Sequence, residues 1–273
     1  MRLFINPASK IQLDAVKRSL PGALLLSGQE GVGLTTLSRW LADKALSSFL
    51  QPTDAKNVPD SSGTISVESI RSLYDETRGK RTSAAIYIID DADRMSPGAQ
   101  AAFLKLLEEP NSNTHFILNS HHPERLLATI TSRTQHVHVR PVTAAQTEEF
   151  LASFPAIDAT KRMQLQFIAA GLPAELHRLI SDEEYFVAKA KVMGDARTFL
   201  QASPYEKLVV IQRYQADREK ALALIEGATR ILRHSLSAKP SHGSIEQLER
   251  LSEVYERISR MGNIRLQLAR AAV

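Results

Sequence analysis

The chain has 273 residues, 43% of them hydrophobic, which predicts a globular protein of about two domains. Its net charge of +4 is small beside 34 basic and 30 acidic residues, so strong autonomous binding to nucleic acid is not expected. The absence of cysteine excludes disulfides and cysteine-ligated zinc. No apolar run is long enough to span a membrane and residues 1–7 do not resemble a secretory signal, so we expect a cytoplasmic protein.

The N-terminal part of the chain predicts a helix, a strand and a second helix. An amphipathic helix lies within residues 1–20. Residues 23–26 are apolar throughout, as in a buried strand, and a helix is expected from about residue 35 to residue 50. A strand, a glycine-rich turn and a helix in succession are the context in which phosphate-binding loops occur.

The turn between this strand and helix matches most of the phosphate-binding pattern G-x-x-x-x-G-K-[ST]. Gly28 and Gly33 occupy the glycine positions, Gly31 lies between them, and Thr35 occupies the position of the metal-coordinating hydroxyl. Leu34 replaces the lysine, whose charge-assisted hydrogen bonds to phosphate contribute roughly 1.5 to 3 kcal/mol each. Two interpretations follow: a residual nucleotide site that uses backbone amides alone, or a turn that only connects strand and helix.

The next segment is polar and carries a basic cluster. Residues 51–63 form a short polar stretch, residues 64–67 alternate as in a strand, and residues 68–77 predict a helix. The basic cluster at residues 78–81 has no interleaved aromatic residue for stacking on bases. A solvated turn is therefore favoured there over a contact with DNA.

The clearest signal in the chain is the apolar run at residues 84–89, which ends at Asp90 and Asp91. This pattern is typical of a buried parallel strand that delivers acids at its carboxyl end, where open α/β sheets bind ligands. The later elements are a helix over 97–109, a strand over 115–118 ending in Asn119-Ser120-His121, a helix over 123–130 and a strand over 135–139. Five strands with helical crossovers predict a parallel sheet covered on both faces.

Three pieces of this region resemble the core of one protein family. They are residues 90–95, 103–111 and 126–134, and the similarity extends upstream over residues 65–73. At this order and spacing they resemble the gamma and delta-prime group of bacterial DNA polymerase III clamp-loader subunits, which are AAA+ proteins. The resemblance implies an α/β AAA+ domain over residues 1–140, a helical lid over 141–182 and an all-α collar for oligomerisation over 183–273. Residues 262–268 resemble the closing motif of that collar, within a final helix expected to run from residue 245 to the terminus.

The resemblance also implies roles around the glycine-rich turn. The family's ATPases usually have Asp-Glu where this chain has Asp90 and Asp91, and the glutamate orients the attacking water. The shorter Asp91 side chain withdraws its carboxylate by more than about 1 Å, and a misplacement of that size can cost on the order of a hundredfold in rate. His121 stands where relatives carry the residue that senses the γ phosphate, although these polar residues could simply cap the strand.

The lid and the end of the sheet each have a position where relatives carry an arginine. Ala174 or Glu175 replaces the sensing arginine of the lid, and Arg178, about one turn later, could substitute. Arg133, within residues 131–134, resembles the arginine of a serine-arginine-cysteine motif that reaches the ATP bound by a neighbouring subunit. Guanidinium suits that role because it is always charged and binds phosphate oxygens through a planar fork.

An impaired loop together with a retained Arg133 predicts a delta-prime-like stator that does not hydrolyse ATP. The expected partners are gamma/tau-type and delta-type clamp-loader subunits, the sliding clamp and, through the assembled complex, primer-template DNA, with no membrane. No cofactor is expected: zinc is excluded, and residual binding of ATP or ADP is doubtful. Two alternatives are a gamma-type ATPase that tolerates Leu34 and a non-catalytic AAA+ scaffold or nucleic-acid-binding protein outside the clamp loader.

Overall fold

The computed structural model describes residues 3–60, 62–77, 83–108, 113–238 and 241–272. The basic cluster at 78–81 and the predicted helix end at Glu109 lie outside these residues. The chain divides into two compact units, Met1–His177 and Arg178–Val273, which are described separately. Within the described ranges, no helix is both long and apolar enough to cross a membrane.

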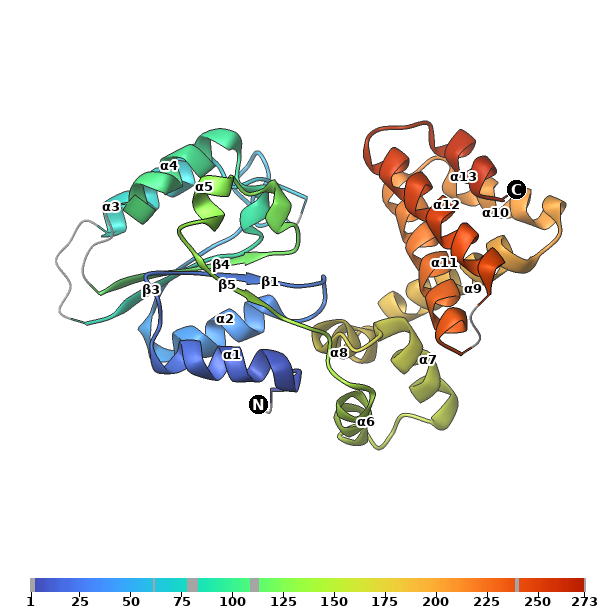
Figure 1. The fold of residues 1–273 in the computed structure, drawn as a ribbon, viewed down its shortest axis with the longest axis horizontal. Helices are drawn as coiled ribbons and strands as arrows, with labels where there is room; N and C mark the ends of the chain where they lie inside the picture. Colours follow the sequence, from blue (N-terminus) through green and yellow to red (C-terminus); the bar gives the residue numbers. More distant parts are fainter. Residues whose placement is uncertain (1–2, 61, 78–82, 109–112, 239–240, 273) are drawn as a thin grey trace. The chain divides into compact units, whose positions relative to one another are not determined.

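A five-stranded parallel sheet forms the centre of the first unit (Figure 1). Its strands are β1 (Ala23–Ser27), β2 (Leu46–Leu50), β3 (Ala85–Ile89), β4 (Thr114–Ser120) and β5 (Gln135–His138), in the order β2-β3-β4-β1-β5. β1 and β3 are buried at every position. Such continuous burial explains their uninterrupted apolar sequence, because parallel strands are covered on both faces.

Helices cover both faces of this sheet, as the sequence predicts (Figure 1). The helices α3 (Val67–Thr77), α4 (Pro97–Glu108) and α5 (Ala128–Thr131) lie on one side, and α1 (Pro7–Arg18) and α2 (Leu34–Ala42) lie on the other. Neighbouring residues of β1 divide between the two cores: Leu25 packs with the first group of helices, whereas Leu24 and Leu26 pack with the second. This alternation fixes the register of the strand.

The second strand of the sheet lies elsewhere than predicted. α2 ends at Ala42, where Asp43 has a φ of +47°, and residues 46–50 form strand β2 beside β3. Residues 64–67 form no named strand: Thr64 and Ile65 make isolated bridges, and Val67 begins α3. The predicted helix to residue 50 and the predicted strand at 64–67 are therefore wrong. Pairing with β2 satisfies backbone groups along the edge of β3, and this tertiary requirement outweighs local helical spacing.

The predicted helix over 123–130 is also wrong. A short 3-10 turn spans Pro123–Arg125 and α5 begins only at Ala128. The intervening residues are extended because Gln100 of α4 takes their backbone groups. Its Nε2 donates to the carbonyl of Arg125 at 3.2 Å, and its Oε1 accepts from the N–H of Leu127 at 2.8 Å.

The first unit also holds most of the predicted lid. It contains α6 (Ala144–Ala152), α7 (Ala159–Ala169) and the first part of α8 (Pro173–Ser181). Thr143 and Gln146 form a capping box at the start of α6, which satisfies two otherwise unpaired backbone N–H groups. The predicted domain boundaries at 140 and 182 stay predictions. The first compact unit ends at His177 and the second begins at Arg178.

The second unit is entirely helical over its described residues. Its helices are α9 (Glu183–Gln201), α10 (Pro204–Tyr214), α11 (Arg218–Ala238), α12 (His242–Ser259) and α13 (Ile264–Ala272). Phe199, Leu224, Val254 and Leu268 are among its fully buried core residues. The predicted single helix from residue 245 to the terminus is wrong, because α12 and α13 are separated at residues 260–263.

Backbone geometry explains this break. Met261 has a φ of +67°, and the N–H of Gly262 donates to the carbonyl of Arg257 at 2.8 Å. A Cβ at Gly262 would lie 2.5 Å from that carbonyl oxygen, so only glycine fits there. A left-handed residue beside a glycine is a common helix terminus, and this one turns the chain back so that α13 can pack against α12.

Candidate functional site

The glycine-rich turn joins β1 to α2, as predicted. Gly31 and Gly33 have φ values of +84° and +95°, which favour glycine, and Gly33 is the N-cap of α2. A Cβ at Gly28 would lie 2.7 Å from the carbonyl oxygen of Val139, just beyond β5. Each of these glycines is therefore required by the shape of the turn.

The side chain of Leu34 is buried in the protein core. This leucine is the first residue of α2, is only 2% exposed and packs in the same apolar cluster as Leu24 and Leu37. A side chain in this position supplies no positive charge to the turn. Its burial instead attaches the start of α2 to the sheet.

The side chains of Thr35 and Asp90 lie close together and are hydrogen-bonded to each other. Thr35 Oγ1 donates to Asp90 Oδ2 at 2.9 Å and lies 3.1 Å from Oδ1. Asn119 Nδ2 donates to Asp90 Oδ1 at 2.6 Å and to Ser38 Oγ at 3.0 Å. The hydroxyl and the carboxylate that a nucleotide enzyme would direct at its metal are engaged with neighbouring side chains. Among the described residues, no group of three or more His, Cys, Asp or Glu is placed to hold a metal ion.

Asn119 is the residue of this network that sequence reasoning placed at the strand end but did not choose. It is 1% exposed, and its buried Oδ1 has no hydrogen-bond partner among the residues that the structure describes. β4 pairs Asn119 with Leu26 of β1, a register that brings the amide to Asp90. The sequence prediction missed Asn119 because β4 continues to Ser120, two residues beyond the predicted end at 118.

Asp91 and His121 lie at the rim of the turn. His121 Nδ1 is 2.8 Å from the carbonyl oxygen of Gly28, and its Nε2 is 3.8 Å from Asp91 Oδ1. Burial raises the pKa of the Asp91 carboxyl, and the negative charge of Asp90 raises it further. Asp91 also has a left-handed backbone, with a φ of +47°. Through its Nδ1, His121 is hydrogen-bonded to the backbone of the glycine-rich turn.

The start of α8 closes against the turn. The backbone N–H groups of Ala174 and Glu175 donate to the carbonyl oxygen of Gly31 at 2.9 and 3.1 Å. A Cβ at Gly31 would lie 2.8 Å from the Cβ of Glu175. First-turn amides of a helix have no partner within the helix, and here the loop carbonyl supplies one. Where relatives place an arginine, this chain thus presents backbone contacts and an acidic residue.

The remaining candidate of the lid is engaged in a stacking contact. The guanidinium of Arg178 lies 3.9 Å from the ring centroid of Tyr185, within the second unit. Such contacts between a cation and an aromatic face stabilise the pair by roughly 0.5 to 1 kcal/mol at exposed sites.

Arg133 belongs to a different part of the first unit. It follows α5 and precedes β5, which is an edge strand of the sheet. One terminal nitrogen donates to the carbonyl of Thr129 at 3.1 Å, and the other lies 3.0 Å from Glu108 Oε1. The side chain remains 39% exposed. The guanidinium is therefore ordered by its own unit and accessible to a partner.

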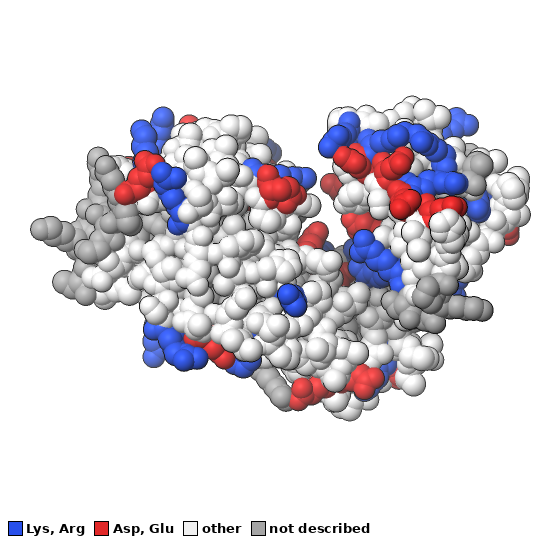
Figure 2. All heavy atoms as spheres, viewed as in Figure 1, with Lys and Arg blue, Asp and Glu red and all other residues white. Residues whose placement is uncertain are grey.

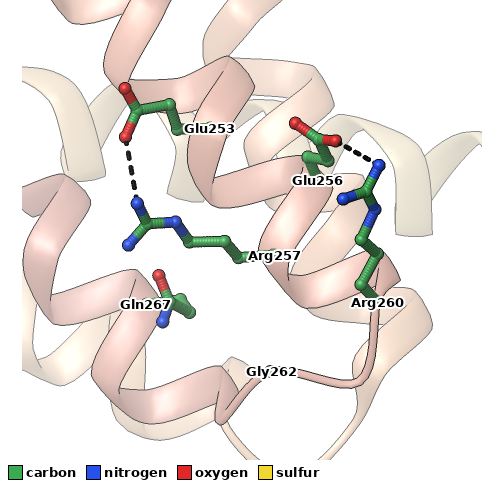
Figure 3. Close-up of a pocket in the computed structure, with 6 residues that line it drawn as sticks. All are labelled: Glu253, Glu256, Arg257, Arg260, Gly262 and Gln267. Carbon is green, nitrogen blue, oxygen red and sulfur yellow. Dashed lines mark hydrogen bonds and ion pairs between the residues drawn. The ribbon is translucent and has the colours of Figure 1, made fainter.

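A cavity of about 400 Å³ lies in the second unit at the junction of α12 and α13 (Figure 3). Its lining residues are Glu253, Glu256, Arg257, Arg260, Gly262 and Gln267. Its arginines pair with glutamates one turn earlier, Arg257 with Glu253 at 3.5 Å and Arg260 with Glu256 at 2.7 Å. Because these charges compensate one another, the cavity has no strong preference for an ion of either sign.

Comparison with known proteins relates the chain to one replication family. A family model described as "DNA polymerase III, delta subunit" matches residues 49–143. The delta' subunit of DNA polymerase III from Bacillus subtilis is 30% identical over 127 residues, 46% of this chain and 38% of that protein. The delta' subunit from Pseudomonas aeruginosa is 36% identical over 95 residues, 34% and 29% of the two chains.

Other matches are to gamma and tau proteins. The tau subunit from Escherichia coli is 27% identical over 233 residues, 75% of this chain and 33% of that protein. The chain thus spans less than two fifths of the length of each of these curated relatives. A gamma subunit-related protein from Thermotoga maritima has the same fold, with a TM-score of 0.54 at 18% identity and 97% of each chain covered.

A parallel α/β domain that carries a glycine-rich phosphate-type turn, followed by a helical C-terminal region, is the fold that this chain shares with the gamma subunit-related protein from Thermotoga maritima. The sequence matches to delta' and to gamma and tau proteins support a bacterial clamp-loader subunit of the gamma and delta-prime family.

Replacing Gly31 with alanine tests the contact between turn and lid. We expect Gly31→Ala to lower the free energy of unfolding by about 1 to 3 kcal/mol, because its φ of +84° disfavours alanine and the new Cβ meets Glu175. Hydrogen exchange of the Ala174 and Glu175 amides should accelerate in the variant. Gly22→Ala is the control, since an added Cβ there meets nothing within 4 Å. Unchanged amide protection in Gly31→Ala would contradict the contact.

Replacing Leu34 with lysine tests whether the turn still accepts a nucleotide. We expect Leu34→Lys to destabilise the chain by roughly 2 kcal/mol or more, because it places an ammonium group at a buried apolar position. Leu34→Met, which conserves volume, is the control. Magnesium-ATP should leave the melting temperature of Leu34→Lys unchanged, since Asp90 and Gly31 are already engaged. A rise in melting temperature with ATP concentration would show that the cradle is intact.

Proposed function

We propose that this chain is a delta-prime-like stator of a DNA polymerase III clamp loader. It does not hydrolyse ATP itself, and it donates Arg133 to the ATP bound by a neighbouring subunit. The observation that carries this proposal is the contrast between two sites of one unit. Leu34 is 2% exposed in the core and supplies no charge, whereas the side chain of Arg133 is 39% exposed at the sheet edge.

The turn is a poor match for the chemistry of ATP hydrolysis. Phosphoryl transfer relies on positive charge at the phosphates and on a positioned water. The lysine position holds a buried leucine, and the Asp90 carboxylate already accepts hydrogen bonds from Thr35 and Asn119. Asp91 has a shorter side chain than the glutamate of active relatives, and burial favours its protonated form. These observations support a subunit that does not hydrolyse ATP and whose residual binding of ATP or ADP is doubtful.

Arg133 has the properties that action on a neighbour requires. Its charge is permanent, and a guanidinium can bind two phosphate oxygens at once. Its backbone leaves a short helix and enters an edge strand, where no further strand of the sheet covers it. We infer that the neighbour is a gamma/tau-type subunit, and that a delta-type subunit, the sliding clamp and primer-template DNA complete the assembly.

A gamma-type ATPase is the second candidate. It is favoured by the match to the Escherichia coli tau protein, which covers 75% of this chain, compared with 46% for the Bacillus subtilis delta' protein. Leu34 and the engaged Asp90 argue against it. A nucleic-acid-binding protein outside the clamp loader has less support, because basic and acidic side chains lie interspersed on the face shown in Figure 2.

Substituting Arg133 tests the proposal in the assembled complex. The ATPase rate is measured for a gamma-type subunit with a delta-type subunit, sliding clamp and primed DNA, without this chain, with it, and with Arg133→Ala. We expect the native chain to stimulate hydrolysis. Arg133→Ala should reduce turnover at the neighbouring site by on the order of 10³-fold, and total turnover by less, because other sites in the ring keep their own arginines.

Arg18→Ala is the matched control for this experiment, because Arg18 is an exposed arginine at the end of α1, on the opposite face of the sheet from α5. It should stimulate as the native chain does. Assembly of the complex is followed by gel filtration in each case. Full stimulation by Arg133→Ala, or no assembly of the native chain, would reject the stator function.

A further inference from the structure

The backbone around Arg133 is held by local hydrogen bonds. Its own N–H donates to the carbonyl of Ile130 at 3.0 Å. On either side, Ser132 Oγ donates to the carbonyl of Thr129 at 3.2 Å, and Thr134 Oγ1 donates to that of Thr131 at 3.0 Å. Residues 132, 133 and 134 therefore each make a local hydrogen bond, and these bonds hold the backbone from which the Arg133 side chain extends.

The guanidinium itself is held by two groups from different helices. The carbonyl of Thr129 in α5 accepts from one terminal nitrogen, and the carboxylate of Glu108 accepts from the other. Glu108 is the last residue of α4, so this ion pair joins the end of α4 to the turn that follows α5. The direction of the guanidinium is thus set by atoms at both ends of its fork.

This arrangement leaves donors available. A guanidinium carries five N–H groups, two on each terminal nitrogen and one on Nε. Each terminal nitrogen uses one N–H in these bonds, and the other three N–H groups of Arg133 make no hydrogen bond to any residue that the structure describes. Glu108 therefore does not compete directly for those donors. An arginine side chain that is already oriented also loses less rotamer freedom when it binds.

We propose that Glu108 is a positioning residue for Arg133. Its carboxylate orients the guanidinium so that the remaining N–H groups meet the phosphate oxygens of the nucleotide held by the neighbouring subunit. This inference rests on the proposed function, because it acts through Arg133. Under this proposal, the end of α4 contributes to ATP hydrolysis at the nucleotide site of the neighbouring subunit.

The test compares Glu108→Ala and Glu108→Gln in the complete complex with a gamma-type subunit, a delta-type subunit, clamp and primed DNA. Both side chains are partly exposed, 39% for Arg133 and 53% for Glu108, so the pair has a modest effect. We expect Glu108→Ala to lower turnover at the neighbouring site by about two- to fivefold. Glu108→Gln keeps an oxygen acceptor and should lie between Glu108→Ala and the native chain. Glu124→Ala, an exposed glutamate of the same unit, is the control and should be unchanged.

A double variant separates positioning from other effects. If Glu108 acts through Arg133, adding Glu108→Ala to Arg133→Ala causes no further loss of turnover. A further loss, or faster turnover in Glu108→Ala alone, would overturn the positioning role. If Arg133→Ala lowers turnover and Glu108→Ala does not, only this inference fails. If Arg133→Ala has no effect, the proposed function fails as well.

Discussion

The carboxylate of Asp90 is the point on which the site depends. It collects hydrogen bonds from Thr35 at the start of α2 and from Asn119 at the end of β4, and it stands itself just after β3. Three segments that are distant in the sequence are thereby joined at the carboxyl ends of the strands, where ligands bind in α/β proteins. Because a partly buried carboxylate without hydrogen-bond partners is costly, these bonds stabilise the shape of the turn.

Contacts from the lid reinforce this arrangement on the other side of the turn. The Gly31 carbonyl accepts two N–H groups of α8, and Leu34 attaches the first turn of α2 to the core. In an ATPase of this architecture, nucleotide and metal would link the loop, the acids and the lid. In this chain, hydrogen bonds between protein atoms link Thr35 to Asp90 and Gly31 to α8. The proposed function takes these bonds, with the missing lysine, as features of a subunit that does not hydrolyse ATP.

Arg133 differs from the groups of the turn, because its side chain is accessible to solvent. Its guanidinium is ordered by Thr129 and Glu108, yet its side chain is 39% exposed and keeps N–H groups without a partner among the described residues. An interaction with a partner's phosphate requires such accessibility, whereas hydrolysis within the chain would require an open turn. One unit thus combines a turn whose Asp90 and Gly31 are hydrogen-bonded within the protein with an exposed arginine. That division is what the stator hypothesis requires, and neither feature alone would favour it.

Much of the fold could be predicted because its central strands are buried on both faces. The apolar runs before Ser27 and Asp90 have few interpretations, and the glycine spacing after β1 specifies the turn. β2 was missed because Leu46-Ser-Ser-Phe-Leu50 has no distinct period and takes its structure from β3. The break before α13 had a local signal in Gly262-Asn263, which a helix rarely passes through.

The finer features of the site depend on tertiary geometry that no local pattern encodes. Asn119 reaches Asp90 only because β4 has a particular register with β1, and α8 meets Gly31 through backbone atoms that any sequence possesses. The pairing of Arg133 with Glu108 joins residues 25 positions apart. By contrast, the loss of the lysine at Leu34 was visible directly, because the motif fixes its position.

Phosphate release by the purified chain tests the central claim most directly. It is measured with saturating magnesium-ATP, with and without primed DNA. A rate indistinguishable from that of buffer is predicted, since Leu34 gives no charge and Asp90 is engaged by Thr35 and Asn119. Sustained, protein-dependent turnover that co-purifies with the chain would contradict the account and identify a motor subunit.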